Sequence, residues 1–223
     1  MCHDLTPRID GDADGLDTSY MLRIIAGEFR SRRLASPPDG ELTRPWIHRV
    51  KESVFNMLRG HFEGALVVDL FAGVGTIGLE AVSRGASRVL MVEQDRRIFT
   101  LLQQNVVNLD CGDRADLLQG DALGPVALLR APRPIDLLFI DPPFGMMQDE
   151  AARGRVFAQI EQAAQLMSPT GFVVLRTPLR PDQTPHEIEG MEGPEVREHG
   201  HQHTVCLYAP VQESPPETGG ECA

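Results

Sequence analysis

Short apolar runs alternate with amphipathic stretches along most of the chain. Apolar runs of roughly five residues that end at Gly, Pro or an acid are typical of buried strands, whereas apolar positions that recur every three or four residues are typical of helices. Strands are expected near 66–70, 88–93, 115–118, 135–140 and 171–176. Helical patterns lie between them, near 75–84, 95–108, 121–130 and 153–167. This alternation predicts an α/β fold in which helices cover both faces of a mostly parallel sheet.

The pattern changes after the last of these strands. Two further strands, near 194–199 and 203–209, are joined by a short loop. They predict an antiparallel hairpin at the sheet edge, which brings the sheet to seven strands. The tail at 211–223 is rich in Pro, Glu and Gly, and residues 1–19 are acidic without periodicity. Both tails are therefore predicted to be disordered.

The segment at 20–60 also differs from the alternating region that follows it. Residues 21–26 and 31–35 flank Gly27 and predict a short hairpin. A helical stripe of apolar side chains comes next. We interpret 20–60 as an N-terminal extension and 61–210 as the domain that holds the sheet.

Length and composition narrow the class of protein. A chain of 223 residues suits one main domain, and it contains no apolar run of about 18 residues that could span a membrane. The N-terminus lacks the charged and then apolar pattern of a signal peptide. We therefore expect a cytoplasmic protein, and a monomer.

The sequence does not suggest a disulfide framework or a metal centre. Cysteines occur at Cys2, Cys111, Cys206 and Cys222. None of them forms a C-x-x-C pair, which argues against disulfides and against a zinc site. The alternating His199, His201 and His203 could share one face of a strand, but a solvated sheet edge is favoured over a metal site. No bound metal is expected.

The net charge of −11 is unevenly distributed. Residues 1–20 carry five acids and one base, and residues 181–223 carry nine acids and one base. Residues 21–59, by contrast, carry eight bases and four acids. A basic segment on a nearly neutral body is compatible with phosphate contact, although a solvated charged face would give a similar count. The candidates for phosphate contact are Arg30, Arg32, Arg33, Arg44, Arg49 and Lys51.

The run from Ile135 to Phe144 carries the most specific chemistry. It is an apolar strand pattern that ends in Asp141, Pro142, Pro143 and Phe144. The prolines cannot continue a ladder, so Asp141 is expected at the carboxyl end of a strand, where open α/β sheets bind ligands. A carboxylate and the Pro142 carbonyl can both accept hydrogen bonds from an exocyclic amine, and Phe144 offers a flat face for the base that carries it. The pattern is similar to the Asp-Pro-Pro-Phe signature of amino-methyltransferases.

A second motif, Asp69-Leu-Phe-Ala-Gly-Val-Gly75, predicts a cofactor site at a strand–turn–helix junction. Its spacing matches the Asp-x-Phe-x-Gly-x-Gly motif of S-adenosylmethionine enzymes. That cofactor carries a sulfonium and an ammonium, so an acid beside the glycine turn is electrostatically favourable. Glu93 is expected to hold the ribose hydroxyls, and Asp121 the adenine amine. The candidate cofactor residues are Asp69, Phe71, Gly73, Gly75, Glu93, Gln94, Asp121 and Ala122.

A nicotinamide cofactor is the distant alternative for this glycine turn. Gly73, Gly75 and Gly78 spell G-x-G-x-x-G, and Glu93 follows Gly73 by 20 residues, as in a dinucleotide-binding fingerprint. Asp69 would however place a carboxylate where a pyrophosphate must approach. A nicotinamide-dependent oxidoreductase would also have no use for the motif at 141–144.

These motifs together resemble one family, the RsmD-type guanine-N2 methyltransferases of 16S ribosomal RNA. The resemblance covers about residues 21–209 and includes Arg23-Ile-Ile-Ala-Gly-Glu-Phe-Arg30 and Arg49-Val-Lys-Glu-Ser-Val-Phe55. It implies a Rossmann-like fold, S-adenosylmethionine as methyl donor, and 16S RNA of an assembling small ribosomal subunit as substrate. A methyltransferase acting on adenine N6 or on a protein glutamine is the nearer alternative, because the Asp-Pro-Pro-Phe chemistry would be the same.

Overall fold

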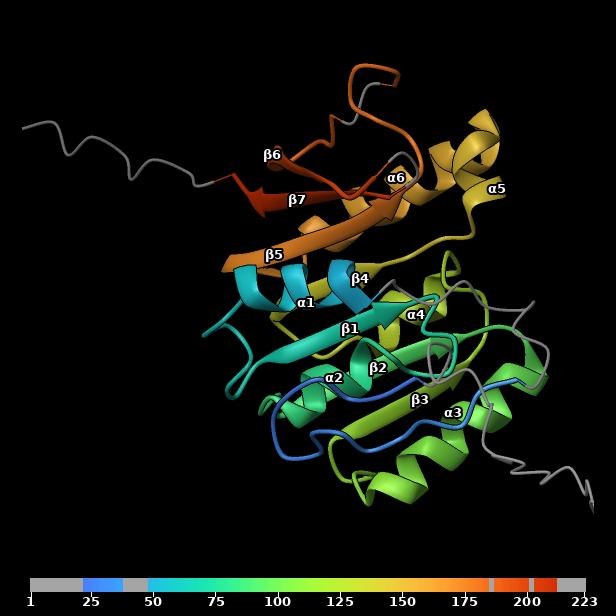
Figure 1. Ribbon diagram of the computed structural model, residues 1–223. Coiled ribbons are helices and arrows are strands. Elements are labelled where there is room, and N and C mark those ends of the chain that lie inside the picture. The colour runs from blue at the N-terminus through green and yellow to red at the C-terminus, as the bar shows by residue number, and fades with distance from the viewer. Residues whose placement is uncertain (1–21, 38–47, 185–186, 201–202, 212–223) are drawn as a thin grey trace, which may run out of the picture.

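A seven-stranded sheet runs through the centre of the molecule (Figure 1). The computed structural model describes residues 22–37, 48–184, 187–200 and 203–211, so the predictions for 1–19 and for the tail from 212 lie outside the described residues. The strands are β1 (Leu66–Leu70), β2 (Arg88–Glu93), β3 (Ala115–Gln119), β4 (Ile135–Ile140), β5 (Met167–Thr177), β6 (Met191–Glu198) and β7 (Thr204–Pro210).

The strand order is β3-β2-β1-β4-β5-β7-β6. The first five strands are parallel, and β7 runs antiparallel to both β5 and β6. The predicted α/β fold, its seven-stranded and mostly parallel sheet, and its antiparallel edge hairpin are therefore confirmed.

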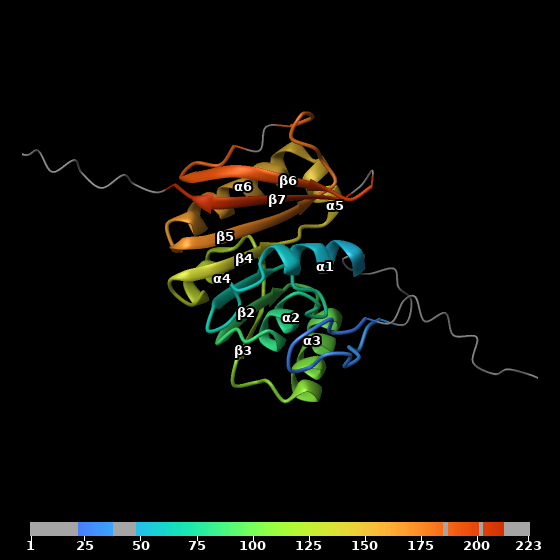
Figure 2. The ribbon, with the colours of Figure 1, turned by 60° about the vertical axis from the view of Figure 1, so that its left-hand side comes forward.

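Helices cover both faces of this sheet (Figures 1 and 2). They are α1 (His48–Met57), α2 (Gly78–Ser83), α3 (Arg96–Leu109), α4 (Pro125–Arg130), α5 (Phe144–Gln148) and α6 (Glu150–Ala164). Apolar side chains of α1, α2 and α3 join one buried cluster, and those of α4, α5 and α6 join the other. Strand β1 supplies both clusters, because Val67 faces the first and its neighbour Val68 faces the second. The alternation of a strand's side chains thus separates the two cores.

Helix α5 was not predicted. It begins at Phe144, directly after Pro143, which caps it with φ −51° and ψ 138°. A pair of prolines reads as a turn in sequence, yet proline is well tolerated at the start of a helix, where its missing N–H would have no partner in any case.

The predicted N-terminal hairpin is a bridged loop and has no regular strands. Arg23 and Arg33 form an isolated antiparallel bridge. Its turn packs against the end of α2, where the N–H of Glu28 donates to the Ser83 carbonyl at 2.7 Å. A Cβ at Gly27, whose φ is +83°, would lie 1.7 Å from that carbonyl oxygen. Only glycine can therefore bring the turn this close to the helix.

A buried carboxylate ties the extension to the sheet domain. The Glu80 side chain on α2 is fully buried and accepts from the N–H groups of Ile25 at 2.7 Å and Ala26 at 3.0 Å. It also pairs with Lys51 of α1 and with Arg84, each at 2.9 Å. One side chain therefore accepts from two backbone N–H groups and a lysine of the extension, and from Arg84, which follows its own helix. Within the described residues, no helix is both long and apolar enough to cross a membrane.

Removing this carboxylate should destabilise the fold. Glu80→Ala leaves the buried Lys51 and Arg84 without their shared partner, so we expect the free energy of unfolding to fall by about 3–5 kcal/mol. Urea denaturation monitored by circular dichroism measures this loss. The matched control is Glu52→Ala on α1, whose carboxylate is exposed and whose removal should change stability little. Equal effects of the two substitutions would show that Glu80 does not anchor the extension.

Candidate active site at the carboxyl edge of the sheet

Three carboxylates lie where neighbouring parallel strands end. Asp69 is in β1, Glu93 ends β2, and Asp141 follows β4. Asp69 is in register with Met91 of β2 and with Phe139 of β4. Because parallel strands end at the same edge, these carboxylates share the side of the sheet where α/β folds bind ligands.

The glycine turn after β1 is held in an unusual backbone conformation. Phe71 has a φ of +64°, and Gly73 and Gly75 have φ values of +58° and +90°. A positive φ at a bulky residue such as Phe71 is uncommon and is typical of ligand-binding turns. Glu93 stabilises the turn, since its carboxylate accepts from the N–H of Gly73 at 2.9 Å and from the N–H of Asp95 at 2.7 Å. Glu93 is half-buried and keeps lone pairs for a ligand.

Asp69 is buried beneath this turn, with 1% of its surface exposed. Its carboxylate accepts from the N–H of Gly78 at 2.8 Å, at the start of α2. A Cβ at Gly78 would lie 2.5 Å from the Met91 side chain and 3.1 Å from the Asp69 carboxylate, so a larger residue would require Met91 to move. The pKa of Asp69 is raised to about 8, mainly by burial and in smaller part by the negative charges of Asp141 and Glu93, while the hydrogen bond from the Gly78 N–H opposes the rise. A nearby cation would reverse this shift.

The remaining cofactor candidates lie beside β2 and after β3. Gln119 of β3 is in register with Glu93, which places Asp121 near the same edge. Asp121 is exposed and accepts from the N–H of Leu123 at 2.9 Å and from Arg155 at 3.2 Å. Gln94 is exposed. Ala122 is buried, and its carbonyl accepts from Gln159 at 3.0 Å.

Asp141 is paired with an arginine that the sequence interpretation missed. Arg176 of β5 donates its Nε to one oxygen of Asp141 at 2.5 Å and its Nη2 to the other at 2.8 Å. The strands bring them together, because Ile140 of β4 is in register with Leu175 of β5. The available signal was an arginine inside the apolar run of β5, since a buried arginine needs an anionic partner.

The Phe144 ring lies beside this ion pair. Its centroid is 5.4 Å from the Arg176 guanidinium carbon and 5.6 Å from the ring of His203, near the start of β7. Pro142 is buried and Pro143 is exposed. The motif at 141–144 therefore combines a half-buried carboxylate with an aromatic ring, and residues of β5 and of the edge hairpin flank it.

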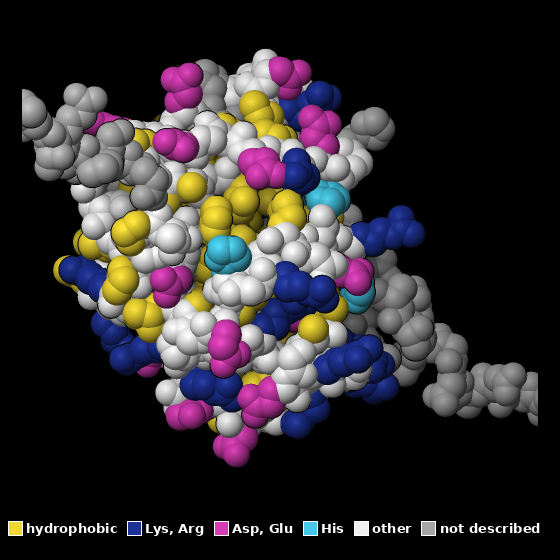
Figure 3. Space-filling model, turned by 90° about the vertical axis from the view of Figure 1, so that its left-hand side faces the viewer, with side chains coloured by type: hydrophobic (Ala, Val, Ile, Leu, Met, Phe, Trp, Pro, Cys, Tyr) yellow, Lys and Arg dark blue, Asp and Glu magenta, His cyan; other side chains and the backbone are white. Residues whose placement is uncertain are grey.

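The candidates for phosphate contact differ in their exposure and in the element that carries them. Arg49 at the start of α1 is exposed, as are Arg30, Arg32 and Arg33 of the extension, and Arg44 lies outside the described residues. Arg30 follows the turn that packs on the end of α2, whereas Asp141 follows the carboxyl end of β4. Figure 3 shows Lys and Arg side chains over the lower half of one face, with acidic side chains among them.

The prediction for Lys51 is wrong. Its side chain is 5% exposed and pairs with Glu80 inside the protein, and burial lowers its pKa. The apolar stripe of α1 is wider than expected: Val50, Lys51, Val54 and Phe55 are all buried, so Lys51 lies on the buried side of the helix. It has no access to a phosphate.

A second buried polar side chain, Asn105 of α3, links the glycine turn to the extension. Its amide donates to the Val74 carbonyl at 2.9 Å and to the Ala35 carbonyl at 3.1 Å, and it accepts from the Ala35 N–H at 2.7 Å. The predicted extension is thus fastened to the element that carries the cofactor candidates.

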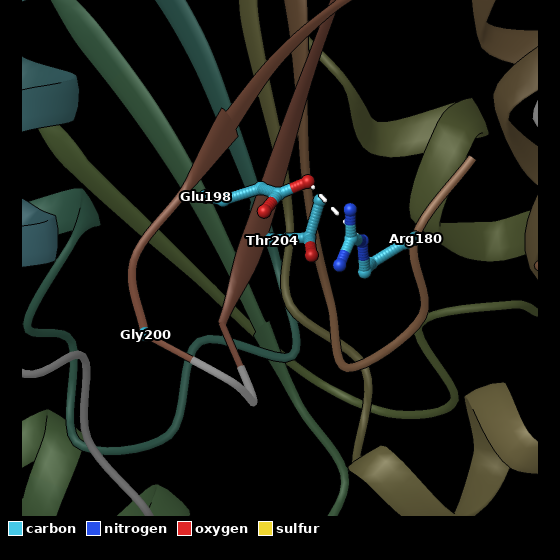
Figure 4. A pocket seen from close by; sticks show the side chains of 4 residues that line it. All are labelled: Arg180, Glu198, Gly200 and Thr204. Carbon is cyan, nitrogen blue, oxygen red and sulfur yellow. Dashed lines mark ion pairs between the residues drawn. The ribbon is translucent and has the colours of Figure 1, made fainter. Parts of the chain in front are cut away.

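A small polar cavity lies beyond the carboxyl end of β5 (Figure 4). It has a volume of about 310 Å³ and is lined by Arg180, Glu198, Gly200 and Thr204. Arg180 pairs with Glu198 at 3.2 Å across it. Among the residues that the structure describes, no three His, Cys, Asp or Glu side chains are arranged to hold a metal, and His201 lies outside them.

The raised pKa of Asp69 leads to a stability prediction. With a pKa of about 8 in the folded state and about 3.9 in the unfolded chain, Asp69 binds a proton more tightly when the protein is folded. Its contribution to stability therefore falls as the pH rises from about 4 to 8. Asp69→Asn removes this penalty, so the melting temperature of the variant relative to the wild type should increase between pH 5 and pH 9. A difference that is constant across this range, measured by calorimetry without ligand, would contradict the assignment.

Comparison with known proteins agrees with this geometry. The family described as conserved hypothetical protein 95 matches residues 22–209. The Ribosomal RNA small subunit methyltransferase D of Escherichia coli is 36% identical over 133 residues, which span 59% of this chain and 65% of that protein. The rRNA N(6)-adenosine-methyltransferase metl-5 of Caenorhabditis elegans is 32% identical over 114 residues, 50% of this chain and 51% of that protein.

A solved structure extends the likeness over nearly the whole fold. The structure of the Escherichia coli protein yhhF, assigned as a methyltransferase, superposes with a TM-score of 0.71 and 27% identity. The superposition covers 85% of this chain and 98% of that one. The sheet and its edge hairpin are thus those of the Rossmann-like methyltransferase fold. The chain belongs to the family of conserved hypothetical protein 95, the RsmD family that its motifs resemble.

Proposed function

We propose that the protein transfers a methyl group from S-adenosylmethionine to the exocyclic N2 amine of a guanine in 16S ribosomal RNA. One observation carries this proposal: the acceptor motif at 141–144 and the acid-lined glycine turn lie at the same edge of one sheet. A cofactor site and an amine-binding carboxylate on adjacent strands are what a direct methyl transfer requires.

The edge suits a cationic cofactor. Asp69 is buried with a raised pKa, and the cause includes two neighbouring carboxylates, so a positive charge there would relieve their repulsion. Asp69 would hold the ammonium side, Glu93 the ribose hydroxyls and Asp121 the adenine amine. When bound, S-adenosylmethionine supplies a methyl group made electrophilic by a positively charged sulfur. A dinucleotide, whose pyrophosphate is anionic, would be repelled by the same carboxylates.

Asp141 and the Pro142 carbonyl would hold the substrate amine. The lone pair of an exocyclic amine is delocalised into the base, so the free nitrogen is a poor nucleophile. Two acceptors that take both N–H groups orient the nitrogen and favour a lone pair directed away from the ring. As the nitrogen gains positive charge, the carboxylate stabilises it. The guanine must be unpaired or turned out of a helix to reach Asp141, and Phe144 can stack on it.

The ribosomal substrate rests on the extension and on relatives. Residues 21–59 carry an excess of four bases, and the Arg side chains at 30, 32, 33 and 49 are exposed. The Escherichia coli relative is named as a small-subunit ribosomal RNA methyltransferase. We infer that 16S RNA in an assembling small subunit is the substrate, and that the protein acts as a cytoplasmic monomer. Adenine N6 is the second candidate, favoured by the Caenorhabditis elegans relative.

The direct test uses small ribosomal subunits that lack this methylation. They are incubated with the protein and isotopically labelled S-adenosylmethionine, and the nucleosides of their RNA are separated by mass spectrometry. Label in N2-methylguanosine supports the proposal. Label in N6-methyladenosine alone would replace guanine by adenine as the target, and label in neither would overturn the assignment to ribosomal RNA.

Two single substitutions should separate binding from chemistry. Glu93→Ala removes hydrogen bonds proposed to reach the ribose, so S-adenosylmethionine binding should weaken by about 1.5–3 kcal/mol. Asp141→Ala should leave that affinity within a few fold and abolish most methyl transfer, because its carboxylate faces the amine. Calorimetry and the labelling assay measure the two effects. Parallel losses of affinity and rate in Asp141→Ala would contradict its role.

The exposed arginines of the extension should contribute to the salt dependence of RNA binding. Replacing Arg30, Arg33 and Arg49 by Ala removes the charges proposed to neutralise phosphates, so the slope of log affinity against log salt should fall by about 0.7 for each phosphate that is no longer neutralised. The control variant replaces Arg130 and Arg133, which are exposed on the face covered by α4, and should keep the wild-type slope. An unchanged slope in the triple variant would mean that the extension does not contact RNA.

A further inference from the structure

We propose that Arg176 is a positioning residue, which holds the carboxylate of Asp141 and the ring of Phe144 in the arrangement that receives the substrate amine. This inference rests on the proposed function and assigns a role to a residue outside the recognised motifs. Arg176 would not touch the reacting atoms. It would act through Asp141.

The ion pair is specific in its geometry. The Nε and Nη2 of Arg176 each meet a different oxygen of Asp141, at 2.5 Å and 2.8 Å. The side chains are 5% and 15% exposed, so water screens the pair little. A two-pronged contact of this kind fixes the plane of the carboxylate as well as its position, which a lysine could not do.

Asp141 needs such a partner because of its position in the chain. It follows the last residue of β4, and two prolines that cannot continue the strand ladder come next. Its N–H donates to the Leu70 carbonyl at 3.3 Å. Arg176, by contrast, lies inside β5, which pairs with β4 on one side and β7 on the other. The rigid strand thus supplies the reference point for the acceptor.

The same guanidinium orients the aromatic ring. Its carbon lies 5.4 Å from the centroid of Phe144, within the range of a cation–π interaction. Phe144 also meets His203 at a centroid distance of 5.6 Å. One side chain therefore contacts both of the groups that are proposed to meet the base.

The ion pair with Arg176 also affects the protonation state of Asp141, because of the other charged groups around it. Among the described residues, Arg176 faces it from β5 as a cation, Asp69 of β1 adds like charge when it is ionised, and His203 lies against the neighbouring ring. A partly buried carboxylate that faced Asp69 without Arg176 would take up a proton more readily. A protonated Asp141 would lose acceptor capacity for the amine. Arg176 thus maintains both the orientation of Asp141 and its ionised form.

Three variants test this role. Arg176→Gln removes the charge, Arg176→Lys keeps the charge without the two-pronged contact, and Arg180→Gln removes a nearby exposed arginine that pairs with Glu198 and does not contact Asp141. For each variant, thermal unfolding, S-adenosylmethionine affinity and the single-turnover rate of methylation of small subunits are measured from pH 5 to pH 9.

We expect Arg176→Gln to lower the methylation rate at least tenfold, with cofactor affinity within about threefold of the wild type. The acidic limb of its pH–rate profile should move to higher pH. Arg176→Lys should keep the wild-type position of that limb and recover only part of the rate, and Arg180→Gln should match the wild type.

Other outcomes overturn the inference. If Arg176→Gln keeps the wild-type rate, or if its rate, affinity and melting temperature fall together with no change in the pH profile, Arg176 is only structural. These results leave the proposed function intact, because the wild type is active in the same assay. A wild type that methylates no small-subunit RNA overturns the proposed function, and this inference falls with it.

Discussion

Three carboxylates at the carboxyl edge of the sheet, with Asp69 buried among them, set the constraint on which the rest of the site depends, because burial and the neighbouring like charges both disfavour an ionised Asp69. Each of them is accommodated differently. Glu93 accepts two backbone N–H groups of the glycine turn and of the following loop, at 2.9 and 2.7 Å. Asp141 is paired with Arg176. Asp69 is buried with one backbone donor and a pKa raised to about 8. The three carboxylates at this edge carry more negative charge than Arg176 neutralises, and a cationic ligand would supply the missing positive charge.

A fourth carboxylate, Glu80, fulfils a structural role by the same physical rule. It is as buried as Asp69, but it is surrounded by Lys51, Arg84 and two backbone donors. Glu80 therefore fastens the N-terminal extension to α2, the helix whose first residue, Gly78, bonds to Asp69. Because Glu80 lies in α2 and Asp69 bonds to the first residue of the same helix, α2 connects the extension to the carboxyl edge of the sheet.

The fold was largely predictable because its strands are short apolar runs with sharp ends. Strands β1, β2 and β4 begin and end where the sequence pattern placed them. The pairing of Asp141 with Arg176 was not predictable, because the two residues are 35 positions apart and meet only through the register of β4 and β5. Lys51 was predicted to be exposed because charged side chains usually are. Its ion pair with Glu80 in the core joins residues 29 positions apart, so the sequence around Lys51 gave no sign of it.

Calorimetric titration of the wild-type protein with S-adenosylmethionine and, separately, with NADH tests most directly whether the acidic edge receives a cationic cofactor. Saturable binding of one S-adenosylmethionine per chain, with no heat from NADH at the same concentrations, is the predicted result. Saturable binding of NADH without binding of S-adenosylmethionine would contradict the cofactor assignment, and with it the methyl transfer built on Asp69, Glu93 and Asp141.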